Sequence, residues 1–518
     1  MNSARRAAFD TATLAFFGVM ITLTALRIAA LFYHPLDLYF DEAQYWSWSR
    51  TLEWGYFTKP PMVAWAIAAT TAVFGDPEWA IRLSAPIAHA LTATVLFALG
   101  RSIYGAWAGF WAGVSWLAIP AVWLASMIIS TDTVMLPFWS LALLALWRLV
   151  ATRSWTWAVV LGLAIGLGIQ AKYAMLYFFL CAGVAAWWAK PVREALGGGR
   201  AIVAALIALL VFVPNIVWNV QNGFATVQHT AANANFEAGD FFNFDELGDF
   251  LTGQIGVIGP VLCILLIGLF WRAGRRMSGL SDQDKFLLAF ILPPLLCVTL
   301  LAFISRAHAN WAVVSYPAAL VWIAGEFIVN KSRRRWLAIA TAANVLLAVA
   351  AGAYVSNPAW SGQNKTMRSM RAWDETAREI ALRAVAQPGE APFTAVLVDD
   401  RATFFELAYY WRHARRAGAP LPPVRMWRLH AEARSSADAT DPMRPEEGGR
   451  VLVVHLTPRY LPLVAGDFTV FRTVEHLTIP LGGGVNRDIE ISVGEGFAPV
   501  PRDEAFMQRF RDASRREP

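Results

Sequence analysis

The chain has 518 residues, of which 57% are hydrophobic and 16% are charged. About a quarter of the residues of a soluble domain are charged, so this composition excludes an ordinary soluble globule and indicates a polytopic membrane protein. The net charge of +6 does not indicate a nucleic-acid-binding protein, because the basic residues fall mainly in short loops between apolar runs. The three cysteines lie inside apolar runs, which is typical of small buried residues and not of disulfides or a metal site.

Long apolar runs begin near the N-terminus, and at roughly 20 residues per span they predict about eleven transmembrane helices. The predicted spans are residues 11–33, 80–100, 106–127, 134–150, 156–170, 173–189, 201–218, 251–271, 286–304, 309–328 and 336–355. The run Met62–Phe74 is too short to cross a membrane and follows Pro60 and Pro61, so it predicts a helix that lies in the membrane interface.

Basic residues in the short loops set the predicted orientation. With the N-terminus in the cytoplasm and alternating spans, every basic cluster, from Arg5 and Arg6 to Arg333–Arg335, falls on the cytoplasmic side. The sequence therefore predicts that the segment after Tyr354 lies outside the cytoplasm, which is the periplasm if the cell is Gram-negative.

The composition changes after Tyr354, where charged residues and prolines become frequent. We expect residues 1–355 to form a membrane domain, whose first periplasmic loop, residues 34–79, contains interfacial helices. Residues 356–518 are expected to form a soluble periplasmic α/β domain. Its predicted elements are the strands Ala395–Val398 and Val451–His455 and the helix Ala402–Arg415.

The stretch from Asp37 to Pro61 contains an acidic pair, Asp41 and Glu42, between two strongly apolar segments. Charged groups are costly inside a bilayer, so this stretch is predicted to be a loop at or beyond the membrane surface. A carboxylate there can act as general base, cation ligand or sugar contact, or Asp41 can be the N-cap of the following helix.

The same stretch ends with an aromatic residue, Tyr56, and a lysine, Lys59, before two prolines. A lysine at this place either extends its charge to the membrane surface or neutralises a phosphate.

Three further outer segments contain charged or titratable groups. Asp132 is either a cap of the next span or a functional acid, because an acid at that depth is costly. Lys172 is an exception to the positive-inside pattern and suggests an anionic partner, and Arg306 and His308 repeat that exception. Together these groups form the pattern that an anionic lipid head group needs.

The runs DEAQYW, YFTKPPM, FGDPEWAIRLSAPIAHA, STDT and AKYAML resemble the GT-C class of membrane glycosyltransferases. The resemblance is to the branch that holds lipid A aminoarabinose transferases, protein O-mannosyltransferases and rhizobial lipopolysaccharide galacturonosyltransferases. It covers roughly the first 330 residues and is most specific from Asp41 to Arg82, and the segment FFELAYYW resembles one found in the soluble domain of such enzymes.

This resemblance implies a sugar donor carried on a polyprenyl phosphate, inverting single displacement, and an acceptor that approaches from the periplasm. The family motifs assign catalysis to Asp41 and place Lys59, Asp132 and Lys172 at the site. The implied lipid-phosphate ligands are Lys59, Lys172, Arg306 and His308, of which the last two are inferred from position. Glu42, Tyr56 and Asp132 are the expected contacts of the acceptor or donor sugar.

The expected function is transfer of a hexosyl or pentosyl group to lipid A, lipopolysaccharide or another envelope glycan. Transfer to protein is one alternative, and a transporter or flippase of a lipid-linked sugar is another; a transporter is expected to have charges within its spans and helices broken at the midplane. The partners would be membrane lipids, the polyprenyl-linked sugar and the glycan acceptor. The sequence assigns no metal ligands and leaves a divalent cation open.

Overall fold

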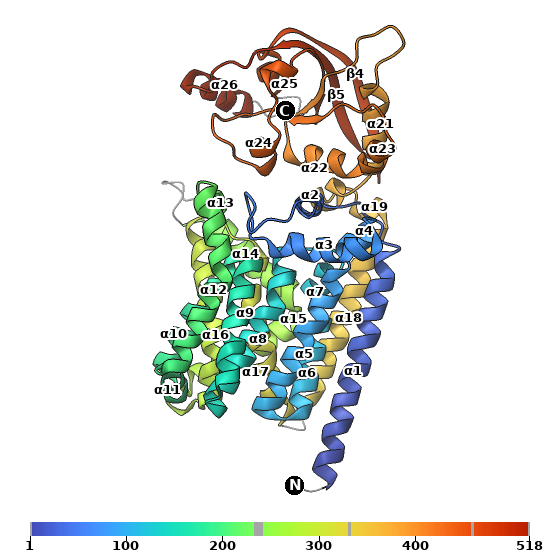
Figure 1. The fold of residues 1–518 in the computed structure, drawn as a ribbon. Coiled ribbons are helices and arrows are strands. Elements are labelled where there is room, and N and C mark those ends of the chain that lie inside the picture. The colour runs from blue at the N-terminus through green and yellow to red at the C-terminus, as the bar shows by residue number, and fades with distance from the viewer. Residues whose placement is uncertain (1–2, 233–241, 330–332, 457–459, 516–518) are drawn as a thin grey trace. The chain divides into compact units, whose positions relative to one another are not determined.

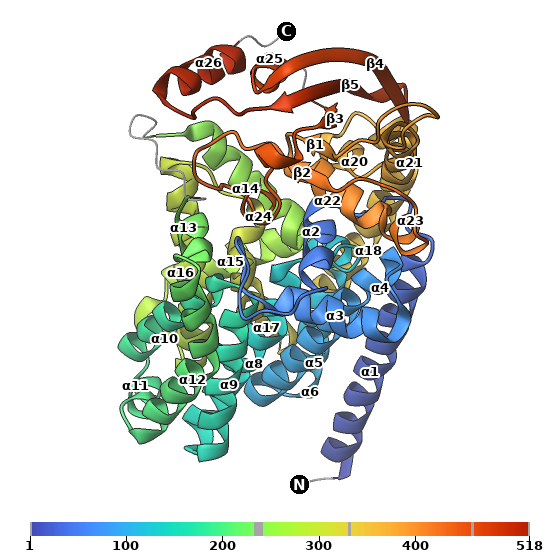
Figure 2. The ribbon, with the colours of Figure 1, turned by 45° about the horizontal axis from the view of Figure 1, so that its top comes forward.

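The computed structural model describes residues 3–232, 242–329, 333–456 and 460–515, which divide into two compact units. The helical unit comprises residues 1–34 and 52–352, and the sheet unit comprises residues 35–51 and 353–518 (Figures 1 and 2). The first predicted loop is therefore divided between the two units, with its acidic pair in one and its lysine in the other.

Helices make up almost all of the helical unit. They are α1 (Ser3–Leu31), α3 (Met62–Phe74), α4 (Glu78–Arg82), α5 (Ser84–Tyr104), α6 (Ala106–Ala118), α7 (Pro120–Ala125), α8 (Thr131–Thr152), α9 (Trp155–Ala171), η1 (Tyr173–Leu176), α10 (Tyr177–Trp188), α11 (Lys190–Leu196), α12 (Gly199–Gln221), α13 (Ala225–Ala232), α14 (Phe244–Ile258), α15 (Pro260–Gly274), η2 (Met277–Gly279), α16 (Asp282–Ile304), η3 (Ala309–Ser315), α17 (Tyr316–Ile328) and α18 (Arg334–Ser356). The last of these continues into the sheet unit.

The predicted polytopic helical fold is confirmed, although fewer of its helices are long continuous spans than the predicted total of about eleven. Among the described residues, seven helices are long and apolar enough to cross a membrane, or eight if the bent pair α14 and α15 counts as one. The remaining predicted spans are helical but shorter or broken. For example, Pro120 divides residues 106–127 into α6 and α7, because the residue before a proline, Ile119, takes an extended conformation.

The sharpest break lies between α14 and α15, whose axes differ by 110°. Gly259 there has a φ of +89°, and Pro260 has no N–H with which to continue the helix. The buried Asn344 of α18 donates a hydrogen bond to the carbonyl of Ile258 at 3.0 Å, which satisfies a backbone group that the break leaves without a helical partner. The predicted single span 251–271 is thus two helices.

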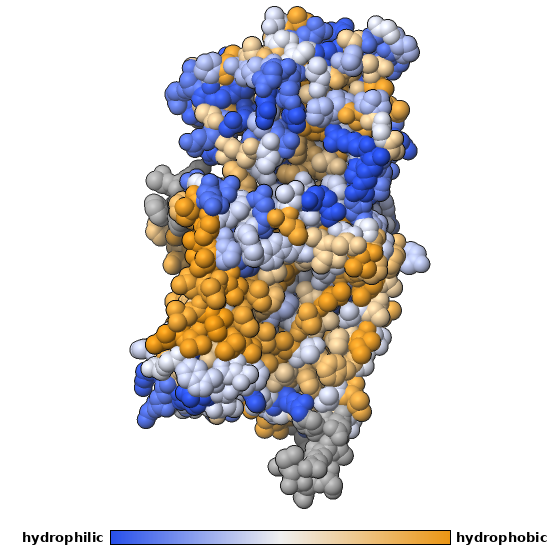
Figure 3. Space-filling view, in the orientation of Figure 1, coloured by the Kyte–Doolittle hydropathy of each residue, from blue (hydrophilic) through white to orange (hydrophobic). Residues whose placement is uncertain are grey.

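Apolar side chains cover the bodies of these helices, as Figure 3 shows for one face. Exposed leucines of α12, such as Leu206 and Leu210, belong to this surface, which suits contact with lipid chains. Inside the unit α9 packs closely on α12. The two backbones are so near that a Cβ atom added at Gly162 would lie only 2.5 Å from the carbonyl oxygen of Ala204, so only glycine fits there.

The sheet unit is built on one mixed sheet of strand order β2-β1-β3-β5-β4. The strands are β1 (Ala395–Val398), β2 (Val424–Met426), β3 (Arg450–His455), β4 (Phe468–Gly482) and β5 (Val485–Phe497). Strands β2, β1 and β3 are parallel, and β5 and β4 extend the sheet as an antiparallel hairpin. The predicted strand at 395–398 has the observed bounds, while the long hairpin was not predicted.

Short helices accompany this sheet. They are α2 (Phe40–Trp48), α19 (Pro358–Ser361), α20 (Lys365–Ser369), α21 (Trp373–Ala384), α22 (Arg401–Tyr410), α23 (Arg412–Arg416), α24 (Ser436–Thr440), η4 (Pro445–Glu447), α25 (Leu461–Ala465) and α26 (Glu504–Arg515). The predicted helix 402–415 is observed as α22 and α23, and Asp400 caps its first turn by accepting the N–H groups of Ala402 and Thr403. A core that includes Trp427, Val453 and Phe506 lies against the sheet.

Candidate active site

A charged cluster in the helical unit joins Asp132, Lys172 and Asn310. The ammonium of Lys172 lies 2.7 and 2.8 Å from the two carboxylate oxygens of Asp132, and the amide of Asn310 donates to one of them at 2.8 Å. The side chains of Asp132 and Lys172 are 15% and 21% exposed, so water screens this ion pair only in part.

The three members of this cluster come from three places in the chain. Asp132 is in the first turn of α8, whose N-cap is Ser130, so Asp132 is not merely the cap. Lys172 is the extended residue between α9 and η1, and Asn310 is in η3. Carboxylates are favourable near a helix N-terminus, so the location of Asp132 keeps an anion beside Lys172.

The loop with Tyr56 and Lys59 is fixed by side chains from the end of α12 and from α13. Asn215 donates to the carbonyl of Trp54 at 2.7 Å, and Thr226 donates to the carbonyl of Tyr56 at 2.6 Å. Within the loop the N–H of Tyr56 donates to the carbonyl of Lys59 at 3.0 Å. The backbone on both sides of Tyr56 is thereby held, and Lys59 extends from an ordered turn.

Tyr56 itself is buried, and its hydroxyl accepts the N–H of Glu53 at 3.2 Å. Burial raises the pKa of Tyr56 to about 12, so the phenol stays neutral. Its observed role is to hold the loop.

A hydrogen-bond path connects this loop with the turn that contains Lys172. The hydroxyl of Tyr173, the residue after Lys172, donates to Asn215 Oδ1 at 2.8 Å, and Asn219 donates to the same hydroxyl at 3.1 Å. Because Asn215 also holds the carbonyl of Trp54, one buried amide supports the segments of both lysines.

Arg306 and His308 lie in the link between α16 and η3. The link is held by Gln254 of α14, which donates to the carbonyl of Ala309 at 3.2 Å and accepts from the hydroxyl of Tyr316 at 2.6 Å. Arg306 is exposed and forms no ion pair with any residue that the structure describes.

The imidazole of His308 packs edge-on against Trp311, with ring centroids 5.3 Å apart. Partial burial lowers the pKa of His308, Arg306 and Lys172 lower it further, and Glu246 opposes them. At neutral pH His308 is therefore a neutral hydrogen-bonding group and not a cation.

Asp41 and Glu42 belong to the sheet unit. Helix α2 begins at Phe40, so Asp41 lies in its first turn and is not the N-cap. Its Oδ1 is 3.5 Å from the guanidinium of Arg401, and its side chain is 34% exposed. Glu42 is fully buried, and its carboxylate accepts the N–H of Tyr39 at 3.0 Å, which stabilises the first turn of α2.

The structure thus brings Asp132 and Lys172 into direct contact and puts Tyr56 and Lys59 in one ordered turn, while Asp41 and Glu42 share the first turn of α2. Sequence reasoning missed Asn310, Asn215 and Arg401. Asn310 is separated from SRAH only by Ala309, and Arg401 stands shortly before FFELAYYW, so both lie close to recognised motifs, whereas Asn215 has no such signal.

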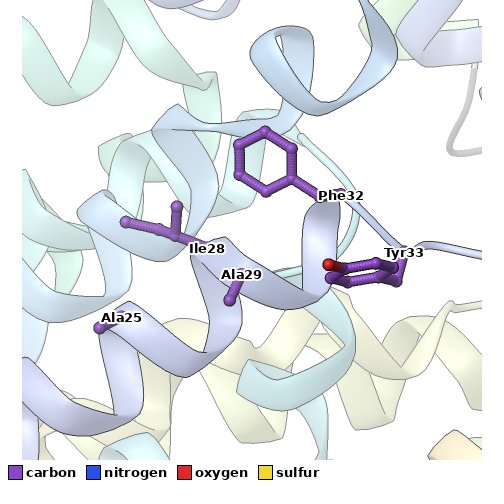
Figure 4. Close-up of a pocket in the computed structure, with 5 residues that line it drawn as sticks. All are labelled: Ala25, Ile28, Ala29, Phe32 and Tyr33. Atoms are coloured by element: carbon purple, nitrogen blue, oxygen red, sulfur yellow. The ribbon is translucent and has the colours of Figure 1, made fainter.

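The described residues contain no group of three or more His, Cys, Asp or Glu that could hold a metal ion. A pocket at the end of α1 is lined by Ala25, Ile28 and Ala29 of that helix and by Phe32 and Tyr33 of the turn that follows it (Figure 4). No charged side chain lines it, so it is not a candidate site for the reaction.

Comparison with known proteins identifies the fold. Residues 58–218 match the family model described as dolichyl-phosphate-mannose-protein mannosyltransferase. The solved structure of ArnT from Cupriavidus metallidurans bound to undecaprenyl phosphate has a similar fold, with a TM-score of 0.61 and 16% identity over 93% of this chain and 97% of that one. The Archaeoglobus fulgidus oligosaccharyltransferase gives a TM-score of 0.51 at 15% identity, over 91% of this chain and 72% of that one. The chain has the GT-C fold of membrane glycosyltransferases, which confirms the resemblance seen in its motifs.

The chain is also similar in sequence to two bacterial glycosyltransferases. It is 36% identical over 316 residues, 59% of its length, to the lipid A galacturonosyltransferase RgtD of Rhizobium johnstonii. It is 32% identical over 175 residues, 31% of its length, to an undecaprenyl phosphate-alpha-4-amino-4-deoxy-L-arabinose arabinosyl transferase of Pseudomonas aeruginosa. The matches span 64% and 30% of those two proteins.

Proposed function

We propose that the protein transfers a sugar from a polyprenyl phosphate to lipid A or a related envelope glycan, on the periplasmic side of the bacterial inner membrane. The observation that supports this most is the Asp132–Lys172–Asn310 cluster, a partly sheltered charged group in a chain with the GT-C fold. The similarity to a lipid A galacturonosyltransferase supports lipid A as acceptor. Because that match is longer than the match to the aminoarabinose enzyme, we propose a hexuronosyl donor.

In the proposed reaction an acceptor oxygen attacks the anomeric carbon while the bond from that carbon to the phosphate oxygen breaks. The bond pair leaves with the lipid phosphate, which departs as an anion and needs no acid to protonate it. Charge therefore accumulates on the phosphate, and fixed cations beside it lower the barrier. We assign this role to Lys59, Lys172 and Arg306, with His308 as a neutral hydrogen-bond donor.

Asp41 is the proposed catalytic carboxylate. It takes the proton of an acceptor hydroxyl as the new bond forms, or orients the acceptor if the attacking group is itself a phosphate. Asp132 has a different proposed role, because its two oxygens hold the ammonium of Lys172 in place. Single displacement of this kind inverts the anomeric configuration.

Membrane orientation follows from the basic loops and is part of the proposal: the N-terminus is cytoplasmic and the sheet unit is periplasmic. The domain boundary near residue 355 also belongs to it, with residues 1–355 as the membrane domain. Of the first loop, residues 35–51 are grouped with the sheet unit.

One observation bears on the transporter alternative. Transporters often contain helices broken within the membrane, and α14 and α15 form such a break at Gly259. The side chain against that break is Asn344, an uncharged amide that is occupied by the carbonyl of Ile258. The break is therefore accounted for by a neutral amide that satisfies the backbone, and it does not by itself indicate a transporter.

The experiment that tests the proposal supplies purified protein in lipid nanodiscs with undecaprenyl-phosphate galacturonic acid and lipid A. Mass spectrometry should show lipid A heavier by one hexuronosyl group, with and without a chelator of divalent cations as parallel arms. Protein and peptide acceptors in further arms test the protein O-glycosyltransferase alternative. The transporter would be established instead by two results together: no transfer from either a hexuronosyl or an aminopentosyl donor, and movement of the donor across proteoliposome membranes.

A further inference from the structure

The segment that contains Asp41 is an integral part of the sheet unit. The N–H of Asp37 donates to the carbonyl of Met370 at 2.9 Å, and its carboxylate accepts the N–H of Trp373, at the start of α21, at 2.7 Å. Further along, the N–H of Leu38 donates to the hydroxyl of Tyr410 at 3.2 Å. The backbone just before α2 is thus fixed by residues more than 300 positions away.

Helix α2 then packs on the aromatic face of α22, the helix that contains most of the FFELAYYW motif. The ring of Trp46 meets Tyr409 edge-to-face with centroids 5.0 Å apart, and the indole of Trp48 donates to Ser436 at 3.1 Å. Both tryptophans are only 6% exposed, so the rotation of α2 about its axis is set by this packing. The FFELAYYW motif therefore provides part of the surface on which α2 packs, the helix whose first turn contains the acidic pair.

Arg401 contacts the first turn of α2 at two points. Its guanidinium is 3.5 Å from Asp41 Oδ1 and lies over the ring of Phe40, 4.6 Å from the centroid. Arg401 is the first residue of α22, directly after Asp400, which caps that helix, so its backbone is fixed. The side chains of Arg401 and Asp41 are 38% and 34% exposed, and an ion pair this open to water adds little stability. What this contact can set is the direction in which the carboxylate of Asp41 points.

We propose that Arg401 is the positioning residue for Asp41, and that the sheet unit exists in part to present this carboxylate. The proposal rests on the assignment of Asp41 as the catalytic group. Arg401 holds one oxygen of the carboxylate while the ring of Phe40 holds the guanidinium, so the rotamer of Asp41 is fixed before the acceptor binds.

The test measures hexuronosyl transfer to lipid A for Arg401→Gln, Arg401→Lys and Phe40→Leu. We expect Arg401→Gln to lower kcat about tenfold with the donor KM unchanged, because the carboxylate is misplaced but the lipid phosphate contacts remain. Arg401→Lys should recover most of that loss, and Phe40→Leu should show a smaller one. Arg415→Gln is the matched control, because Arg415 also lies over an aromatic ring of this region, that of Trp411, and should transfer as wild type does.

A second readout separates positioning from a merely structural role. In an Asp41→Asn background, Arg401→Gln should cause no further loss, since a positioning residue acts only through the group it positions. The proposal is overturned by wild-type kcat in Arg401→Gln, or by an equal loss in the presence and absence of Asp41. If wild-type protein transfers no sugar, the proposed function fails, which is a different result. Thermal melting of each variant verifies that it is folded, and Arg401→Lys and Phe40→Leu remain informative if Arg401→Gln is not.

Discussion

Residues 35–61 are the part of the first loop that contains the acidic pair and the lysine. Its two halves, residues 35–51 and 52–61, are neighbours in sequence but are held by different units. The first half is held by α21 and α22 of the sheet unit through Asp37, Leu38 and Trp46. The second half is held by Asn215 and Thr226 of the helical unit. One connected loop therefore provides an acid fixed to a soluble sheet and a lysine fixed to membrane helices. Substitutions in the first half should lower the rate of the chemical step, and substitutions in the helical unit should weaken binding of the donor phosphate.

Asp41→Asn should have the largest effect, because it removes the proposed proton acceptor while leaving the shape of the side chain. We expect kcat for transfer to fall by about 10²- to 10⁴-fold. The measurement is sugar transfer to lipid A by mass spectrometry, with Asp374→Asn, an exposed acid of the same unit, as control. Transfer at the wild-type rate in Asp41→Asn would remove this half of the loop from the chemistry.

Lys172→Gln should come next, with a loss of about 10²-fold in kcat/KM for the donor, since a fixed cation beside the leaving phosphate disappears. Asp132→Asn should cost less, because Lys172 keeps its charge and loses only its orientation. The control is Lys190→Gln, a lysine whose side chain is 76% exposed and which should be neutral. Equal losses in Lys172→Gln and Asp132→Asn, with an unchanged donor KM in both, would mean that the pair is structural.

Helix bounds could be predicted from the sequence wherever a local signal ends the helix. Met62–Phe74 has its predicted bounds because Pro61 precedes it and Gly75 follows it. The strand at 395–398 was predicted from its continuous apolar run. The break at Gly259 was not, because the run 251–271 is apolar throughout and the amide that completes the break, Asn344, is far along the chain.

The sequence names candidate site residues but not the contacts between them. Motifs identified Asp132 and Lys172, and topology placed both on one side, yet nothing local indicates that they bind each other or that Asn310 joins them. The division of the first loop was also beyond sequence reasoning. It depends on the packing of Trp46 against Tyr409, a match between two aromatic faces that only the folded sheet unit creates.

Asn215→Ala tests the support of the second half of the loop, with a smaller effect. It removes the donor to the carbonyl of Trp54 and the acceptor for Tyr173, so both of these groups lose a hydrogen-bond partner. We expect kcat/KM for the donor to fall by about fivefold to tenfold and thermal stability to fall as well, by about 0.5 to 1.5 kcal/mol for each hydrogen bond lost. Asn222→Ala is the control, because that exposed amide bonds only its own helix, through the carbonyl of Trp218. Equal effects of the two variants would show that Asn215 has no special role.

His308 should give the smallest effect, visible as a pH dependence. Its pKa is lowered, so the imidazole is neutral from pH 7 to 8 and the donor KM should be flat there. Below its pKa the ring becomes a cation, and affinity for the phosphate should rise by about twofold to fivefold, the size expected for a partly exposed charge pair. His308→Gln should lose this acid-side gain and keep the flat region. A donor KM that improves between pH 8 and pH 7 would contradict the lowered pKa.

The most direct test of the central claim is to measure binding of undecaprenyl phosphate and transfer of sugar in the same preparations of Asp41→Asn and Lys59→Met. If the two halves of the loop divide the work as proposed, Asp41→Asn binds the lipid phosphate as wild type does but fails to transfer sugar, while Lys59→Met loses affinity for the lipid phosphate by about tenfold or more. Weakened lipid binding in Asp41→Asn together with wild-type binding in Lys59→Met would contradict the account.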